Sequence, residues 1–539
     1  MPRVQFVLEA GFFIFKPTLS FVFLEERKKK EKITMAEYTS LEKIRLQKLE
    51  ELRVQGVEAY PTRTTRTHTS AQAIAAFEAV EAAATEVKVT LAGRIRSMRP
   101  KGKLAFVHIE DGDGKIQLFL RVNEVGEDRL TFFNKMFDLG DFLEATGVMM
   151  RTKAGEVSLH VHDFTLLAKS ITPLPADKDV TQEDGTVVRY ATLDDPEIRA
   201  RQRYADLAVN PEVRETFRKR AKLVKSLRTF LDDHNFLEVE TPILQPLYGG
   251  AAARPFTTHH NELDQDMYLR ISFELYLKRL LVGNLERVYE IGRDFRNEGV
   301  SFKHNPEFTQ LEFYWAYADY LQVMELTEQM VAYAAGQVTG STKVKFGEHE
   351  LEFKPPWRRV EMRVGILETS GIDIAEHTTA EALLKAIKEK QPKAMPDPNS
   401  TRGKLIDFLV GEFLEPTLIQ PTFLYNYPRD ISPLAKSIPG DPLTVERFEG
   451  YVAGFELCNA FTELNDPLDQ EQRFLEMGRD YADGDEEKQP LDEDYLRAMR
   501  YGMPPNGGFG MGVDRLSMVL LDKHSIREVL LFPALRKEE

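Results

Sequence analysis

Cysteine is almost absent from this sequence, since Cys458 is the only one among 539 residues. A single thiol excludes an intrachain disulfide framework and any zinc site built from several cysteines, and we expect Cys458 to be a small packing residue. Positive charge is also in deficit, with 71 Lys and Arg against 86 Asp and Glu and a net charge of −15. This balance argues against broad nonspecific adhesion to nucleic acid, although it permits a local basic patch.

A long apolar run is missing as well. Phe6–Leu24 is rich in apolar residues, but Glu9 and Lys16 interrupt it, so it is a poor membrane span. It also lacks the basic start and the small-residue cleavage site of a signal peptide. We therefore expect no membrane association. We also expect Met35 to be the natural start and residues 1–34 to be a non-native or disordered extension, which the intact mass of natively expressed protein tests.

The phosphate-binding P-loop pattern G-x-x-x-x-G-K-[ST] does not occur in the chain. The glycine run Gly507–Asp514, GGFGMGVD, lacks the spacing of a dinucleotide fingerprint and lies near the end of the chain. A nucleotide, if the protein binds one, must therefore be held by arginines and carboxylates on a sheet.

An amphipathic helix is expected at Ser40–Gly56, where Leu41, Ile44, Leu49 and Leu52 lie near helical spacing. Its second face is either a solvated surface or an RNA contact. The basic residues of that face are Lys43, Arg45 and Lys48.

Five strand-like segments separated by turns follow between residues 87 and 167, and they suit a small barrel of the oligonucleotide-binding type. Arg99, Phe106 and Gln117 could stack on and hydrogen-bond to unpaired bases there. Phe106 considered alone is better interpreted as a core aromatic residue.

Changes in these patterns predict the domain boundaries. Pro173–Pro175 and the polar residues after it are typical of a linker. The expected parts are an extension at 1–34, an N-terminal helical segment at 35–86, the barrel at 87–170, the linker at 171–190, and a larger domain at 191–539 with a helical insertion at about 317–420.

A polar strand face is the strongest sign of a site. Glu286–Glu298 and Phe308–Trp315 alternate like two strands joined by a charged loop. Side chains on a strand alternate between faces, so one face of this hairpin is apolar and the other is polar. A core hairpin has no need of the polar face. The residues assigned to it are Phe308, Gln310, Glu312 and Tyr314, with Arg296 and Glu298 at the end of the first strand.

Two further segments contribute polar residues. Glu274 stands near the start of a helix and either pairs with Arg270 on the surface or faces a ligand. Phe448–Leu464 reads as strand, and Glu456 joins its polar face only through a bulge, expected near Gly454. The residues of one parity on this segment are Glu449, Asn459, Phe461 and Glu463.

Three motifs occur together in the larger domain. A helical pattern at Val213–Leu231 leads into a strand closed by Pro242, FRNEG and FKHNPEFTQLE lie between residues 295 and 312, and GFGMGVDRL lies at Gly508–Leu516. With this combination, the chain from Met35 onward resembles the class II aminoacyl-tRNA synthetases, most closely the lysyl enzymes, as YGGAAARPF, RISFELYLKRL and NAFTELNDP indicate. The resemblance implies an α+β fold, with an N-terminal OB-fold β-barrel and a catalytic domain whose antiparallel sheet is flanked by helices.

The resemblance implies a lysine–tRNA ligase, which forms lysyl-adenylate from L-lysine and ATP with Mg²⁺ and then transfers lysine to the 3′ end of tRNA(Lys). Such chemistry depends on positioning and charge neutralisation more than on a general base. It also implies a cytoplasmic enzyme and a homodimer through Val213–Pro242. The implied ATP-binding residues are Arg296, Glu298, Lys303, His304, Phe308 and Arg515, of which Arg296 and Arg515 are catalytic, and the implied metal ligands are Glu449 and Glu456.

A pocket for lysine needs carboxylates at its far end and aromatic walls along the apolar stem. By match to the family, the ammonium would lie at Glu274 and Glu463, and the α-amino and carboxylate end at Glu312 and Asn459. The remaining lysine-binding residues would be Gly250, Tyr314 and Phe461. The barrel residues that would read the anticodon are Arg99, Phe106, Gln117 and Glu156.

Lys303, Phe273, Cys458, Ala460 and Phe509 depart from the family pattern, but none removes a charge that the mechanism needs. Three other functions stay open. An asparaginyl or aspartyl enzyme is disfavoured by the pocket carboxylates, and relatives that attach lysine to a protein lack the barrel. The intact arginines and carboxylates argue against a regulatory tRNA-binding protein without catalysis.

Overall fold

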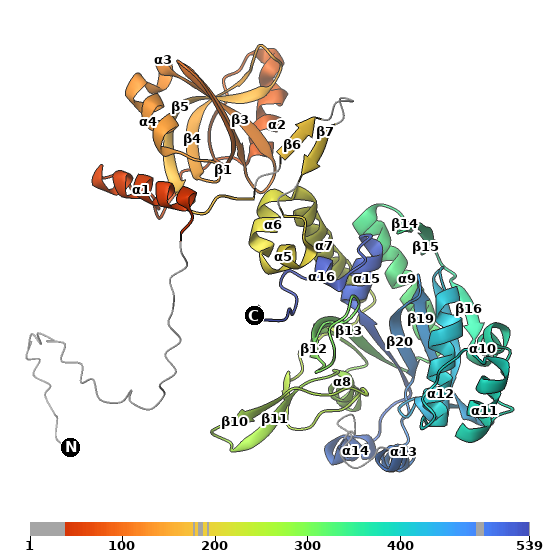
Figure 1. Cartoon of the computed structure of the whole chain (residues 1–539). Coiled ribbons are helices and arrows are strands. Elements are labelled where there is room, and N and C mark those ends of the chain that lie inside the picture. The colour runs from red at the N-terminus through yellow and green to blue at the C-terminus, as the bar shows by residue number, and fades with distance from the viewer. Residues whose placement is uncertain (1–37, 176–177, 182–186, 191–192, 481–489, 538–539) are drawn as a thin grey trace, which may run out of the picture. The chain divides into compact units, whose positions relative to one another are not determined.

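The computed structural model describes residues 38–175, 178–181, 187–190, 193–480 and 490–537, so the expected extension at 1–34 lies outside the described residues. The chain divides into two compact units, Met1–Leu174 and Pro175–Glu539 (Figure 1). In the expected linker, β6 (Lys178–Thr181) and β7 (Val187–Tyr190) pair as an antiparallel hairpin. No helix in the described ranges has the length and apolar character needed to cross a membrane.

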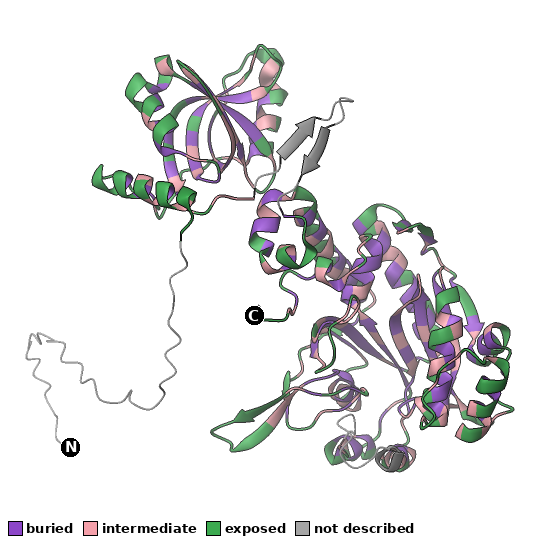
Figure 2. Ribbon diagram, viewed as in Figure 1, coloured by how far each residue is buried: buried purple, intermediate pink, exposed green. Residues whose placement is uncertain are grey.

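The first unit is built on a closed five-stranded barrel, as the sequence predicted. Along two of the strands buried residues alternate with more exposed ones (Figure 2). Buried apolar side chains fill the interior of the barrel. Helices α3 (Val122–Val125) and α4 (Glu127–Met136) connect the third and fourth strands. In pairing order the strands are β1 (Lys88–Lys101), β2 (Leu104–Glu110), β3 (Lys115–Arg121), β5 (Val157–Ala168) and β4 (Phe142–Arg151).

Helix α1 (Ser40–Val54) forms where the sequence predicted it, but its buried side differs. Leu49 and Leu52 are buried, whereas Leu41 and Ile44 are 48% and 49% exposed. Of the four residues at helical spacing, only the last two therefore pack against the unit.

Basic residues take part in holding α1 to its unit. Arg45 is buried, and its guanidinium donates to the carbonyl oxygens of Leu139 and Ser170, each at 2.9 Å. The Lys48 ammonium pairs with the Asp138 carboxylate at 2.7 Å. Arg45 and Lys48 thus have structural partners within the unit. Neither a solvated surface nor an RNA contact, the two interpretations of this basic face, predicted these partners. Helix α2 (Ser70–Val80) follows α1.

A nine-stranded sheet organises the second unit. Its pairs are antiparallel except for two at its edges, β12 with β8 and β16 with β17. In pairing order the strands are β16 (Arg358–Glu361), β17 (Thr422–Pro428), β19 (Asp441–Val452), β20 (Phe455–Thr462), β21 (Asn506–Gly512), β13 (Glu307–Ala316), β12 (Arg287–Phe295) and β8 (Leu237–Glu238), and β18 (Ser437–Ile438) pairs with β19.

The apolar face of the central strands carries the main core. Leu311 and Phe313 of β13 pack there with Phe509 of β21, and the Phe313 and Phe509 rings stack at 4.6 Å. Cys458 is buried in the same core, as expected of a packing residue. The helices that contribute to this core are α7 (Pro211–Asp233), α9 (Tyr320–Thr339) and α15 (Val513–Leu520).

The segment expected to be a helical insertion is divided between several structures. Helix α9 belongs to the main core and β16 to the main sheet, so the early part of 317–420 is integral to the unit. The later part forms a second core against β17 and β19. Its helices are α10 (Met362–Ser370), α11 (Ala380–Lys390) and α12 (Arg402–Leu409).

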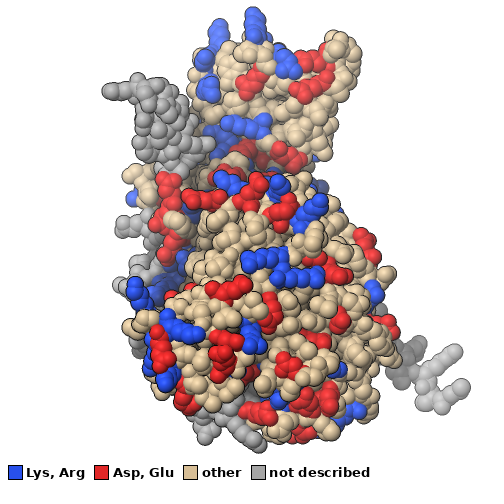
Figure 3. All heavy atoms as spheres, turned by 90° about the vertical axis from the view of Figure 1, so that its right-hand side faces the viewer, with Lys and Arg blue, Asp and Glu red and all other residues tan. Residues whose placement is uncertain are grey.

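Smaller elements complete the second unit. Helices α5 (Pro196–Arg201) and α6 (Arg203–Val209) precede α7, and α8 (Glu274–Val282) precedes β12. On the face shown in Figure 3, acidic and basic side chains are interspersed. The second unit also contains β9 (Leu244–Gln245), β10 (Thr257–His260), β11 (Gln265–Leu269), β14 (Lys343–Phe346), β15 (His349–Glu352), α13 (Pro467–Asp480), α14 (Glu493–Arg500) and α16 (Ile526–Val529).

Candidate active site

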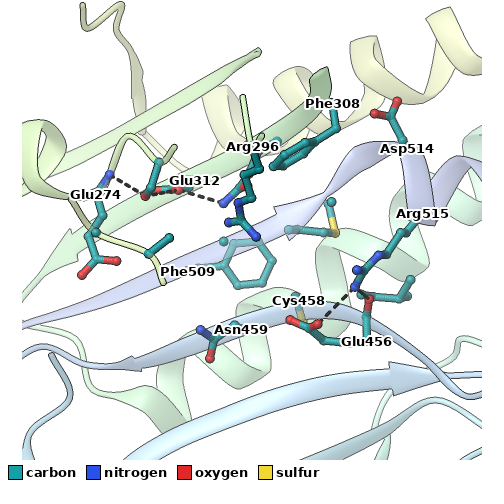
Figure 4. A pocket seen from close by; sticks show the side chains of 18 of the residues that line it. Glu274, Arg296, Phe308, Glu312, Glu456, Cys458, Asn459, Phe509, Asp514 and Arg515 are labelled. Atoms are coloured by element: carbon teal, nitrogen blue, oxygen red, sulfur yellow. Dashed lines mark hydrogen bonds and ion pairs between the residues drawn. The ribbon is translucent and has the colours of Figure 1, made fainter. Parts of the chain in front are cut away.

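The polar face of the central strands lines a cavity of about 340 Å³. Figure 4 shows its side chains converging from several strands and from the start of α15. All of the site residues predicted for the larger domain line it: Gly250, Glu274, Arg296, Glu298, Lys303, His304, Phe308, Glu312, Tyr314, Glu449, Glu456, Asn459, Phe461, Glu463 and Arg515.

Arg296 lies where the chain leaves β12. Its backbone N–H donates to the Pro306 carbonyl at 2.9 Å, which closes the loop between β12 and β13. Its guanidinium lies over the Phe308 ring, 5.1 Å from the centroid. The Nε of Arg296 is buried and has no hydrogen-bond partner. Because a buried unpaired donor is unfavourable, this atom is ready for an anionic acceptor.

Arg515 reaches the cavity from the first turn of α15. Its Nη1 donates to Glu456 Oε2 at 3.1 Å (Figure 4). Its Nη2 approaches His304 Nε2 at 3.3 Å. An arginine only donates, so Nε2 is the acceptor and His304 Nδ1–H donates to Ser301 Oγ at 2.8 Å. Burial, and then the charge of Arg515, lower the pKa of His304. His304 is therefore neutral near pH 7.

Asp514, which sequence reasoning missed, fixes the position of α15. Its Oδ2 accepts from the Thr309 backbone N–H at 2.7 Å, and its Oδ1 pairs with Arg220 of α7. The carboxylate thus ties α15 to β13 and α7 just before Arg515. Its place in the motif GVDRL was the available signal, but the sequence did not indicate its partners.

Glu449 and Glu456 share the cavity because β20 contains a bulge. Gly450 pairs with Cys458, and Tyr451 pairs with Glu456, so Leu457 is the extra residue. The predicted bulge is present, and its extra residue lies three positions after Gly454, near which the bulge was expected. Gly454 instead has φ +74° in the turn between β19 and β20.

The two carboxylates have protein partners. Glu449 accepts from Arg447 Nη2 and from the Tyr451 hydroxyl, both at 2.6 Å. In the described part of the chain, no cluster of three or more His, Cys, Asp or Glu could hold a metal ion. Mg²⁺ is commonly held by one or two carboxylates together with phosphate oxygens. Glu449 and Glu456 therefore fit Mg²⁺ only in company with a phosphate-bearing ligand.

Glu312 of β13 lines the cavity and is buried. Its Oε1 accepts from Ser272 Oγ at 2.9 Å and from Gln310 Nε2 at 2.8 Å. Burial, with the nearby charges of Asp294 and Glu274, raises the pKa of Glu312. A buried carboxyl group with a raised pKa is suited to receive a cationic group, because the cation favours the ionised form of the carboxyl.

The far end of the cavity holds Glu274 and Glu463, which are both buried. Glu274 is therefore not part of a surface pair with Arg270, whose guanidinium instead pairs with Glu290 at 2.6 Å. The partner of both cavity carboxylates is Lys278 of α8, which sequence reasoning missed.

Two glycines leave room at this end. A Cβ on Gly508 would lie 1.8 Å from Glu463 Oε1 and 2.6 Å from the Tyr314 ring. Gly250 has φ +89°, and a Cβ there would lie 3.0 Å from Glu274 Cβ. The glycine run of β21 and the small-residue loop thus shape the cavity wall by close approach.

The barrel presents a separate candidate surface. Arg99, Phe106, Phe119 and His160 form one row across β1, β2, β3 and β5. Phe106 is half-buried and stacks on Phe119 at 4.9 Å, so it lies on the outer face and is not a core residue. Phe119 and His160 extend the platform that the sequence predicted from Arg99 and Phe106.

Gln117 and Glu156 are linked beside this row. Gln117 Nε2 donates to Glu156 Oε2 at 2.6 Å, and Ser158 Oγ donates to Gln117 Oε1 at 3.0 Å. His108 Nε2 lies 2.8 Å from Glu156 Oε1. Gln117 is buried, so its amide can reach a base only if this network opens or if the base approaches its edge.

Comparison with known proteins agrees with both units. Residues 195–536 match the model described as tRNA synthetases class II (D, K and N), and residues 89–167 match an OB-fold nucleic acid binding domain. The chain is 50% identical over 504 residues to the lysine–tRNA ligase of Clostridium tetani, covering 93% of this chain and 97% of that protein. The corresponding protein of Roseiflexus sp. is 51% identical over 504 residues, covering 93% of this chain and 100% of that protein.

Gly508→Ala should destabilise the second unit, because the new methyl overlaps Glu463 and Tyr314. Overpacking of this kind costs about 1–3 kcal/mol. Scanning calorimetry should show a lower unfolding midpoint. Gly336→Ala is the matched control, since a Cβ on Gly336 in α9 meets nothing within 4 Å. Equal midpoints for Gly508→Ala and the unsubstituted protein would contradict the close approach.

Proposed function

The chain belongs to the class II tRNA synthetase family of the D, K and N enzymes, and from this premise we propose that it is a lysine–tRNA ligase. It activates L-lysine with ATP to lysyl-adenylate and transfers lysine to the 3′ end of tRNA(Lys), releasing AMP and pyrophosphate. The observation that carries the choice of lysine is that two buried carboxylates, Glu274 and Glu463, line the same cavity as the aromatic rings of Tyr314 and Phe461.

ATP binds at the arginine-rich end of the cavity. The buried, unpartnered Nε of Arg296 supports its role at the α-phosphate, where a planar fork suits two oxygens. The adenine stacks between Phe308 and Arg515, and exposed Glu298 accepts from its amino group. Lys303 and neutral His304 face the outer phosphates. Lys303 acts as a point charge, since an ammonium cannot form the bidentate contact of an arginine.

Lysine binds at the carboxylate-rich end. Glu274 and Glu463 receive its ammonium, and Tyr314 and Phe461 flank its stem. Glu312 receives the α-ammonium. Asn459 Oδ1 accepts from Arg447 at 2.9 Å, so the Nδ2–H of the same amide is presented to the carboxylate of the substrate lysine. Gly250 also lines the cavity where lysine binds.

This arrangement performs adenylation by alignment. A carboxylate oxygen of lysine forms a bond to the α-phosphorus while the bond from that phosphorus to the bridging oxygen of pyrophosphate breaks, and the electron pair leaves with pyrophosphate. Arg296 stabilises the charge on the α-phosphate as it develops. Mg²⁺ held by Glu449 and Glu456 supplies further charge neutralisation on the phosphates.

The barrel unit binds the anticodon of tRNA(Lys). The outward row of Arg99, Phe106 and Phe119 supports stacking of unpaired bases, and the amide of Gln117 with the carboxylate of Glu156 supplies hydrogen-bonding groups.

We propose that the enzyme is cytoplasmic, because translation in the cytoplasm uses both ATP and tRNA.

The enzyme is a homodimer through the Val213–Pro242 region. Edge strand β8 lies in this region, and Leu237 on it is 52% exposed. Ile243 and Leu244, which follow directly, are 45% and 46% exposed. Exposed apolar residues along a sheet edge are typical of an interface.

ATP–pyrophosphate exchange should occur with lysine alone among the twenty amino acids, and a chelator of Mg²⁺ should abolish it. Glu274→Gln and Glu463→Gln should each reduce lysine-dependent exchange roughly a hundredfold, since a charged hydrogen bond is worth up to about 3 kcal/mol. The exposed Glu350→Gln is the matched control. Exchange with aspartate or asparagine, or silence with lysine, would refute the function, and near-normal exchange in both glutamine variants would refute the subsite.

Phe106→Ala should raise the KM for tRNA(Lys) roughly tenfold, because stacking on an aromatic side chain is worth about 1–3 kcal/mol per base. Lysine-dependent exchange in the absence of tRNA should not change, since Phe106 lies in the barrel unit. Aminoacylation and exchange measured on one preparation separate the two effects. An unchanged KM for tRNA would remove Phe106 from the anticodon surface.

Sedimentation velocity should give twice the mass of one chain. Leu237→Lys should shift the protein towards one copy, because it places a charge on the apolar edge. Leu263→Lys is a control, as Leu263 is 64% exposed in the turn between β10 and β11. A dimer that tolerates Leu237→Lys as well as the control would exclude this edge as the interface.

A further inference from the structure

One charged group that contacts two carboxylates of the cavity wall has no part in the reaction described above. Lys278 of α8 is fully buried, and its ammonium lies 2.5 Å from Glu274 Oε1 and also pairs with Glu463 Oε2. The same ammonium lies 5.9 Å from the ring centroid of Tyr314 and 5.5 Å from that of Phe461. An internal lysine side chain thus contacts the four residues proposed to receive the side chain of the substrate.

Resting on the proposed function, we propose that Lys278 is a positioning residue of the lysine subsite. Its ammonium is the internal counter-ion of Glu274 and Glu463, and it offsets the charge of one carboxylate and leaves that of the other for the substrate ammonium. Two carboxylates buried at one site do not both ionise when no cation is present. With one internal ammonium, the two carboxylates carry a net charge of −1.

Glu463 supplies the contact that the substrate ammonium completes. Its Oε2 pairs with the Lys278 ammonium, whereas its Oε1 is buried and has no hydrogen-bond partner. Gly508 leaves the space that Glu463 Oε1 occupies. A buried carboxylate with unused acceptor sites is costly until a further donor arrives. The subsite can therefore accept the substrate ammonium in addition to the ammonium of Lys278.

The surrounding groups determine the sign of the electrostatic effect. Glu312 and Tyr314 of β13 and Tyr495 of α14 face the cluster, in addition to Glu274 of α8 and Glu463 after β20. Burial, together with the charges of Glu274 and Glu312, raises the pKa of Glu463 well above its usual value, and the Lys278 ammonium opposes this rise. Burial alone lowers the pKa of Lys278, but the two carboxylates more than offset this and raise it. Lys278 thus stays charged throughout the physiological range.

This charge balance contributes to specificity. A side chain with one positive charge neutralises the subsite, whereas an acidic side chain would be repelled by the residual negative charge and a neutral one would leave it buried and unpaired. Penalties of this kind discriminate more strongly than a difference in size. A lone cation would suit an aspartate side chain, but here two carboxylates outnumber it.

The pH dependence of the KM for lysine tests the proposal. In Lys278→Met, one of the two carboxyls takes up a proton near neutral pH, and binding of the lysine ammonium favours the release of that proton. The KM for lysine should therefore rise at pH 7 and fall by up to about tenfold per unit as the pH increases. The unsubstituted enzyme is the reference for these KM values. The KM for ATP should be the same in the variant and in the unsubstituted enzyme. A variant with the normal pH profile would overturn the proposal.

A double variant keeps the proposal testable if Lys278→Met does not fold, because it removes a carboxylate together with its counter-ion. Glu463→Gln alone leaves Glu274 and Lys278 neutral overall, and it should bind lysine poorly. Lys278→Met combined with Glu463→Gln restores a net charge of −1 on Glu274, so the KM for lysine should improve at least tenfold over Glu463→Gln. Losses that simply add would show a purely structural role for Lys278 and would overturn the proposal.

The two levels of inference fail separately. If the unsubstituted enzyme gives no exchange with lysine, the proposed function is wrong whatever the variants do. If it exchanges with lysine but Lys278→Met has a normal pH profile, or the double variant shows additive losses, only the role of Lys278 is wrong.

Discussion

The insertion of β21 between β13 and β20 is the constraint on which the rest of the site depends. Gly510 lies opposite Glu312 on one side and Asn459 on the other, and Gly508 lies opposite Tyr314 and Phe461. Residues that are far apart along the chain thereby become neighbours across two strands. The glycines make this pairing compatible with a cavity, because a side chain at Gly508 would occupy the volume of Glu463 and Tyr314. On the opposite face, Phe509 and Met511 of the same strand pack into the core.

The cavity is electrostatically divided, and the division matches the two substrates of the proposed reaction. Glu274 and Arg515 lie on opposite sides of the cavity, with Arg296 between them (Figure 4). The two arginines line the part where phosphates must be held, and Glu274 and Glu463 line the part where an ammonium must be held. Both kinds of group lie in a partly or fully buried setting, where charge interactions are stronger than in water. Each end is therefore costly when empty and is stabilised by a ligand of opposite charge.

Local periodicity accounts for the parts of the fold that were predicted correctly. The hairpin of β12 and β13 has the predicted alternation, because a strand places successive side chains on opposite faces regardless of its neighbours. The five barrel strands were predicted for the same reason. Where a tertiary contact decided the outcome, local patterns were insufficient. Arg45 takes a buried position on α1 because carbonyl oxygens of a distant segment accept from it.

The sequence by itself determined the family, the two kinds of domain and the side chains that line the cavity, since these follow from motifs and from period-two faces. Only the tertiary structure decided how those side chains are balanced. The bulge at Leu457 turns Glu456 into the cavity, and its position depends on the register between two strands. Lys278 reads as an ordinary polar position on a helix, and its role emerges only when Glu463 is folded against it. A buried charge is defined by its partners, and partners distant in sequence leave no local pattern.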